Sequence, residues 1–148
     1  MSETATTAAR KRTEFRNINA LTDLPSYRLP AAGWVSILHR VSGVLMFALM
    51  PFIIWMFDTS ISSEISYARF TSVFTAGMLG LPGFIWKLVA LALIWAYLHH
   101  FCAGVRHLRM DISHAAVDKR SGASSARVVL AISLLLTAAL GAKLFGLY

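Results

Sequence analysis

The sequence has few charged residues and almost no cysteine. Only 14% of its 148 residues are charged, whereas roughly 25% are charged in typical soluble domains. The single cysteine, Cys102, excludes an internal disulfide bond and a cysteine-based metal cage. The chain also lacks a glycine-rich dinucleotide motif and the set of cysteines that an iron–sulfur cluster needs. Neither nucleotide-cofactor chemistry nor cluster-based electron transfer is therefore expected from this chain.

Hydrophobic residues make up 57% of the chain and fall into long runs. A bilayer core is about 30 Å thick, so a helix that spans it needs about 20 mostly apolar residues. The runs predict an all-α membrane protein with spans at about 33–57, 84–105 and 128–147, preceded by a polar arm over residues 1–32. Pro51 predicts a kink in the first span. We expect a loop over 58–83 with an interfacial helix in its middle, and a second loop at residues 121–125.

Basic residues are distributed unequally between the two sides of the predicted bundle. Six lie at or before position 40, and five lie between the second and third spans. These eleven are Arg10, Lys11, Arg12, Arg16, Arg28, Arg40, Arg106, Arg109, Lys119, Arg120 and Arg127. The other side has only Arg69, Lys87 and Lys143. The positive-inside rule therefore places the N-terminus in the cytoplasm or the matrix. The net charge of +7 indicates membrane orientation rather than binding to nucleic acid.

The first 30 residues bear on which membrane the protein occupies. They are rich in Thr, Ala and Arg, which leaves a mitochondrial presequence open, but Glu3, Glu14 and Asp23 count against one. We therefore expect a bacterial inner membrane rather than a mitochondrial one.

Ser36, His39 and Arg40 form a polar cluster near the start of the first span. A charged group inside a span costs about 2.5–3.5 kcal/mol on insertion scales, which makes such groups candidates for function. Ser36 and Arg40 lie one turn apart on one helix face, with His39 beside them. A hydroxyl and a guanidinium so placed can hold a quinone carbonyl or a carboxylate. An arginine that snorkels to lipid phosphates is the alternative, and the spacing alone does not separate the two.

A second cluster lies at the end of the second span. His100 and His107 are seven residues apart and share a face with Gly104 between them, where a large flat group can approach the backbone. Neutral histidine is a good axial ligand for haem iron. His100 lies roughly 9 Å from the cytoplasmic end of the span, at 1.5 Å per residue. Arg106 and His107 lie at that end, where we expect the haem propionates.

The two clusters are expected at similar depth, because the first span enters from the inside and the second leaves there. His39, Arg40, Arg106 and His107 are then the predicted propionate contacts, and Ser36 and Arg40 the quinone contacts. A partner chain is expected to supply the second haem ligand, since only His100 lies at suitable depth in the second span. The adjacent His99 is expected to make a polar contact or to face lipid. We expect His114 in the polar loop to be solvated.

Together these residues resemble the cytochrome b subunit of succinate dehydrogenase (complex II), the larger of its two membrane anchors. The resemblance covers nearly the whole chain. The family's first motif, Ser-x-x-His-Arg-x-Ser/Thr, is matched by Ser36, His39, Arg40 and Ser42. Its second, His-x-x-x-Gly-x-Arg-His-x-x-x-Asp, is matched completely by His100, Gly104, Arg106, His107 and Asp111.

The resemblance implies an anchor subunit of succinate:ubiquinone oxidoreductase, an enzyme of the respiratory chain and the tricarboxylic acid cycle. It implies that His100 is an axial ligand of haem b, with the second ligand from the smaller anchor subunit, which completes the bundle. It further implies that His39, Arg40 and His107 contact the propionates and that Ser36 and Arg40 help to bind ubiquinone. Flavoprotein and iron–sulfur subunits would oxidise succinate and pass electrons inward.

Three alternatives remain open at this point. An anchor of a quinol:fumarate reductase shares the architecture and differs in the direction of turnover. A haem-free scaffold subunit would have the same helices, with its His and Arg side chains only snorkelling. A small transporter or channel subunit would have polar groups near mid-bilayer on several spans, whereas the third span offers only Ser133 and Thr137.

Overall fold

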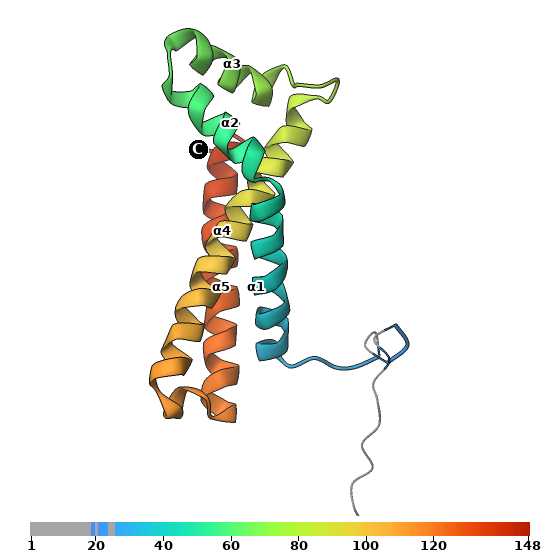
Figure 1. Cartoon of the computed structure of the whole chain (residues 1–148), viewed down its shortest axis with the longest axis vertical. Coiled ribbons are helices and arrows are strands. Elements are labelled where there is room, and N and C mark those ends of the chain that lie inside the picture. The colour runs from blue at the N-terminus through green and yellow to red at the C-terminus, as the bar shows by residue number, and fades with distance from the viewer. Residues whose placement is uncertain (1–18, 20, 24–25) are drawn as a thin grey trace, which may run out of the picture.

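Three long helices form the body of the molecule. The computed structural model describes residues 19, 21–23 and 26–148, and its described residues are helical apart from turns and short connections. The long helices are α1 (Ala31–Ala48), α4 (Gly83–Ile112) and α5 (Lys119–Leu144). Figure 1 shows them running side by side, with α2 (Met50–Ile61) and α3 (Glu64–Thr75) as a cap at one end. A single 3₁₀ turn, η1 (His114–Ala116), lies between α4 and α5.

Each of the three long helices has the length and the apolar composition of a membrane span. This confirms the predicted all-α membrane fold with three transmembrane helices. Most of the predicted arm over residues 1–32 lies outside the described residues, and so do its basic residues Arg10, Lys11, Arg12 and Arg16.

The first predicted span, 33–57, proves to be two helices rather than one kinked helix. α1 ends at Ala48, and α2 begins at Met50 after the junction residue Leu49. Pro51 lies in the first turn of α2, where its missing N–H removes no helical hydrogen bond. The proline therefore starts a new helix instead of bending the old one. Figure 1 shows α2 leaving the direction of α1.

The segment that follows contains the predicted helix. α3 begins with a capping box in which Ser63 and Ser66 satisfy each other's backbone N–H groups. Beyond α3 the backbone turns sharply at Gly77, whose φ of +97° favours glycine. At Gly83 a Cβ would come within 2.5 Å of the Phe74 carbonyl oxygen, so only glycine allows α3 to approach the start of α4 this closely.

The connection between α4 and α5 is shorter than the sequence predicts. α4 continues to Ile112, well beyond the expected end of the second span at 105. Residues 121–125, predicted as a loop, are instead part of the first two turns of α5. Asp118 starts this helix by accepting a hydrogen bond from the N–H of Arg120. The prediction was wrong because small residues with weak helix preference become helical where they allow close packing, and Gly122 is buried in this way.

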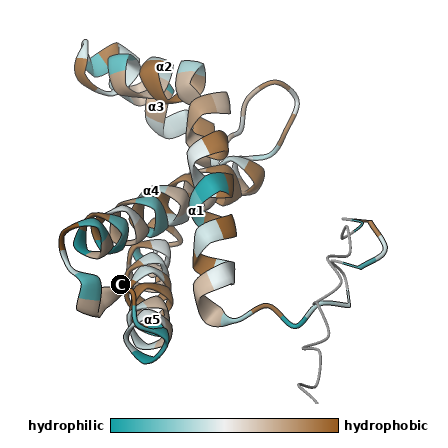
Figure 2. Cartoon of the chain, turned by 60° about the horizontal axis from the view of Figure 1, so that its bottom comes forward, coloured by the Kyte–Doolittle hydropathy of each residue, from teal (hydrophilic) through white to brown (hydrophobic). Residues whose placement is uncertain are grey.

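The two ends of the bundle differ in composition as well as in connectivity. Figure 1 places the start of α1 and the α4–α5 connection at one end, and the C-terminus with the α2–α3 cap at the other. In Figure 2, hydrophilic residues gather at the end of α4 and α5 that the view brings forward. The connectivity therefore agrees with the charge asymmetry, although which end faces the cytoplasm remains a prediction.

Small side chains line the contacts between the long helices. α4 packs against both α1 and α5, and its buried residues recur at spacings of three and four: Ala96, His99, Ala103 and Arg106. The core combines Ala103 with Val35 of α1 and with Ala126 and Val129 of α5. Lipid offers no hydrophobic driving force between helices, so their association depends on close backbone approach over small residues.

We expect Ala103→Leu to destabilise the bundle, because Ala103 is fully buried where three helices meet. Overpacking of a filled core typically costs about 1–3 kcal/mol. The measurement is the fraction of protein that stays folded after heating in detergent. Ala138→Leu is the matched control, since Ala138 is exposed on α5. Equal heat resistance of the two variants would contradict the packing.

Candidate functional site

Three histidines from two helices meet between α1 and α4. The ring of His39 on α1 stacks on that of His100 on α4, with centroids 4.1 Å apart and planes 19° apart. The ring of His107, two turns further along α4, lies 5.1 Å from that of His39. The structure thus brings both predicted clusters to one depth, as the antiparallel arrangement of the first two spans requires.

The backbone of α1 orients the ring of His100. Its Nδ1 lies 3.1 Å from the carbonyl oxygen of His39 and 3.3 Å from the hydroxyl of Ser42. A carbonyl only accepts hydrogen bonds, so Nδ1 carries a hydrogen in this contact, and in the neutral tautomer Nε2 then carries the lone pair. Metal-binding histidines commonly have this arrangement, in which the second nitrogen donates to a carbonyl and fixes the tautomer.

Ser42 and Gly43 are supporting residues to which sequence reasoning gave no role. Ser42 is fully buried and donates a hydrogen bond to the His39 carbonyl at 2.8 Å. At Gly43 a Cβ would lie 3.1 Å from Cε1 of His100, so the absent side chain makes room for the ring. The only sequence feature that could have indicated these roles is the position of Ser42 and Gly43 one turn after His39. That position becomes informative only once α4 is known to pack there.

Gly104 lies next to the ring of His39, and the predicted approach of a large flat group at this glycine stays a prediction. A Cβ at this position would lie 3.8 Å from Nε2 of His39, so the His39 ring lies over the glycine in this structure. The Nε2 atom of His39 is buried and, among the described residues, has no hydrogen-bond partner. An unsatisfied buried polar atom costs about 1–3 kcal/mol, which a ligand oxygen beside it would recover.

These residues fit a haem on chemical grounds. The imidazole of His100 has its Nδ1 bonded to a carbonyl, so in its neutral form it would offer Nε2 to iron. His39 offers an unpartnered ring nitrogen for an oxygen ligand such as a propionate. His107 lies beside it on the α4 face shared with His100.

Ser36 and Arg40 lie one turn apart on α1, next to His39 in the sequence. Ser36 is half-buried, whereas Arg40 is exposed and so is accessible to a ligand at the surface of the bundle. The structure therefore keeps the two predicted quinone contacts adjacent to the histidine cluster.

Arg106 is not brought to the histidines. It is nearly buried against α5, where its Nε donates to the hydroxyl of Ser125 at 3.1 Å and its Nη2 to the carbonyl of Gly122 at 3.3 Å. Six residues after His100, it lies on a different face of α4. Its predicted contact with a propionate stays a prediction, for which this side-chain conformation offers no support.

His99 and His114 lie in contrasting environments. His99 is fully buried, with Nδ1 3.3 Å from the Ser133 hydroxyl and its ring stacked on Trp95. Of the two expectations for His99, the polar contact is confirmed and the lipid-facing position is wrong. His114 is exposed in η1, as expected of a solvated residue.

Comparison with known proteins gives a consistent set of relatives. The family described as succinate dehydrogenase/fumarate reductase transmembrane subunit matches residues 16–140. A succinate dehydrogenase cytochrome b556 subunit of Coxiella burnetii is 29% identical over 116 residues, 77% of this chain and 88% of the relative. Proteins of the same name from Rickettsia felis and Paracoccus denitrificans are each 30% identical, covering 77% and 72% of this chain and 82% and 76% of theirs.

The matched region contains α1 and α4, all but the last turn of α5, and the whole histidine cluster. With its membrane-length helices, the chain is a membrane protein similar to these bacterial subunits. It belongs to the family of succinate dehydrogenase/fumarate reductase transmembrane subunits.

Proposed function

We propose that this chain is the cytochrome b anchor of a succinate:ubiquinone oxidoreductase and that it contributes one axial ligand to a haem b. The meeting of His39, His100 and His107 between α1 and α4 carries the proposal. The proposed partners of the chain are the flavoprotein and iron–sulfur subunits, which oxidise succinate. The proposed location is a bacterial inner membrane, with the N-terminus in the cytoplasm. The chain acts in this enzyme as an anchor and holds no flavin.

His100 is the proposed axial ligand, because its Nδ1 is held by the His39 carbonyl. His39 and His107 are the proposed propionate contacts, together with Arg40, and the free Nε2 of His39 supports this role. Arg106 is the weakest of the predicted contacts, since it is hydrogen-bonded to α5. When bound, the haem supplies an iron centre that can take up and release single electrons.

A smaller anchor subunit is proposed to cover the His100 face and to donate the second axial ligand. Tyr97 and Leu93 lie on α4 one and two turns before His100 on that side. They line an apolar groove with residues of α1, α2 and α5. A partner helix seated there would complete the bundle and could bring a ligand of its own to the haem.

Quinone reduction is proposed at Ser36 and Arg40, next to the haem and near the inner face of the membrane. Arg40 stabilises the negative charge that develops on a quinone oxygen as it accepts electrons. Ser36 holds the head group by a hydrogen bond. Because Arg40 is exposed in the chain alone, a ligand or a partner subunit can complete its surroundings.

Replacing His100 by Ala should remove or strongly perturb the b-type haem, because the ligand nitrogen is lost. The measurement is the reduced-minus-oxidised spectrum of the purified complex. His114→Ala, which removes an exposed histidine, should leave the spectrum unchanged. A wild-type complex without a b-type band would instead favour the haem-free scaffold.

Replacing Arg40 by Ala should lower quinone reduction by about 100-fold or more, as for other charge-stabilising groups. Succinate oxidation by an artificial dye acceptor should persist, because the dye bypasses the quinone. Arg127→Ala, which removes another exposed basic residue, is the control. Intact quinone turnover in Arg40→Ala would refute the site. Assays with succinate and with fumarate would separate this enzyme from a quinol:fumarate reductase.

Ser42→Ala should leave haem bound but change its spectroscopic signature, because the hydroxyl next to His100 Nδ1 is lost. The measurement is the electron paramagnetic resonance spectrum of the oxidised complex. Ser60→Ala is matched, since Ser60 also donates to a carbonyl three residues earlier but lies in α2. Identical spectra for Ser42→Ala and wild type would show that Ser42 does not position the ligand.

A further inference from the structure

A groove runs between α4 and α5, on the side of α4 that faces away from His100. It has a volume of about 370 Å³. At 100° per residue, Cys102 and Arg109 lie on the opposite side of α4 from His100, and both line the groove. The groove is therefore separate from the histidine cluster and from the face where a second anchor subunit is proposed.

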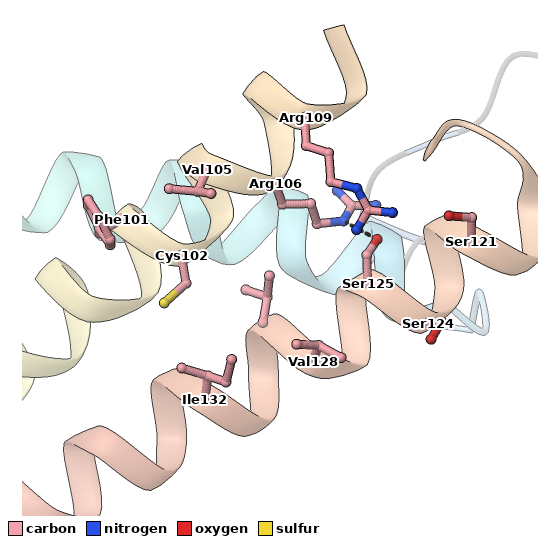
Figure 3. A pocket seen from close by; sticks show the side chains of 11 residues that line it. Phe101, Cys102, Val105, Arg106, Arg109, Ser121, Ser124, Ser125, Val128 and Ile132 are labelled. Atoms are coloured by element: carbon pink, nitrogen blue, oxygen red, sulfur yellow. Dashed lines mark hydrogen bonds between the residues drawn. The ribbon is translucent and has the colours of Figure 1, made fainter. Parts of the chain in front are cut away.

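One end of the groove is cationic and rich in hydrogen-bond donors. Arg106 and Arg109 both line this end, and Figure 3 shows the side chain of Arg106 reaching the hydroxyl of Ser125 on α5. Arg106 is only 6% exposed, yet both of its hydrogen bonds go to uncharged oxygens, those of Ser125 and Gly122. A nearly buried cation without a counter-ion is costly, so this end favours an anion. Guanidinium groups and hydroxyls together are suited to a phosphate.

The other end of the groove is apolar and extends toward the middle of the spans. It is lined by Val105 and Phe101 of α4 and by Val128 and Ile132 of α5. Val128 is 52% exposed in the chain. A cationic end that continues into an apolar channel is complementary to a phospholipid, in which an anionic phosphate is followed by apolar acyl chains.

The surroundings carry more positive charge. A neighbouring depression at the start of α5 is lined by three basic residues and one acidic residue, and it shares Ser124 with the groove: Lys119, Arg120, Arg127 and Asp118. Basic pockets between transmembrane helices on the inner side of a membrane attract anionic lipid head groups. The charge favours an anionic lipid, because its net negative charge neutralises these cations, whereas a zwitterionic head group adds a cation of its own and an uncharged protein segment leaves Arg106 and Arg109 without a counter-ion.

We propose that this groove binds an anionic phospholipid from the membrane leaflet that surrounds the α4–α5 connection. The phosphate lies at Arg106 and Arg109 with the hydroxyls of Ser121 and Ser124, and one acyl chain follows Val128 toward Ile132. Arg106 is thereby assigned to this phosphate instead of a haem propionate. The other proposed haem and quinone contacts are not among the lining residues of the groove, so the lipid site can be tested separately from the proposed redox function.

The first test is native mass spectrometry of the purified complex with added dioleoyl phosphatidylglycerol or dioleoyl phosphatidylcholine. Wild-type complex should retain the anionic lipid in preference to the zwitterionic one. Arg109→Gln should weaken phosphatidylglycerol binding by about fivefold, as expected for one cation at a membrane surface. Lys143→Gln removes the same charge from an exposed residue at the other end of α5, far from the groove, so it should weaken binding by less than about twofold.

The second test identifies the occupant directly. A photoreactive amino acid placed at Val128 in the complex should form a cross-link with the mass of a phospholipid. Cross-linking to a protein subunit would overturn the proposal, since the groove would then be a protein interface. Equal retention of the two lipids, or equal effects of Arg109→Gln and Lys143→Gln, would also overturn it, because attraction would not depend on the groove.

Discussion

The close approach of α4 to its two neighbours is the constraint on which the rest of the structure depends. Small buried residues, Ala103 on α4 and Ala126 on α5, allow the helix backbones to come together. The same approach brings His100 against the backbone of α1 and Arg106 against that of α5. Larger side chains in the core would separate the helices and remove both sets of contacts together.

Helical periodicity gives α4 two different polar faces. His100 and His107 lie on the face toward α1, where rings stack and a backbone carbonyl fixes a tautomer. Arg106 lies on the face toward α5, where it bonds a hydroxyl and a carbonyl. One short stretch of sequence can therefore serve a proposed redox site and a proposed lipid site without competition between them.

Polar groups within the spans are mostly satisfied locally. Ser133 and Thr137 donate to carbonyls three and four residues earlier in α5, which removes the cost of an unpaired hydroxyl in an apolar environment. Among the described residues, the buried side-chain atoms without a partner are Nε2 of His39 and Nε2 of His99. The first lies within the candidate site. The second lies beside it in the core of the bundle, where His99 also bonds Ser133.

Much of the architecture is encoded in local sequence, since an apolar run of sufficient length must become a helix in a bilayer. The three spans, and the similar depth of His39 and His100, follow from run lengths and antiparallel order. Only tertiary structure decided that the chain breaks at Leu49 and that residues 121–125 are helical, because Gly122 becomes helical by packing against Arg106. Likewise, the sequence predicted Arg106 near the histidines, but only the packing of α5 decided which helix the Arg106 side chain contacts. The roles of Ser42 and Gly43 were also undetermined, since they arise from a contact between residues 58 positions apart.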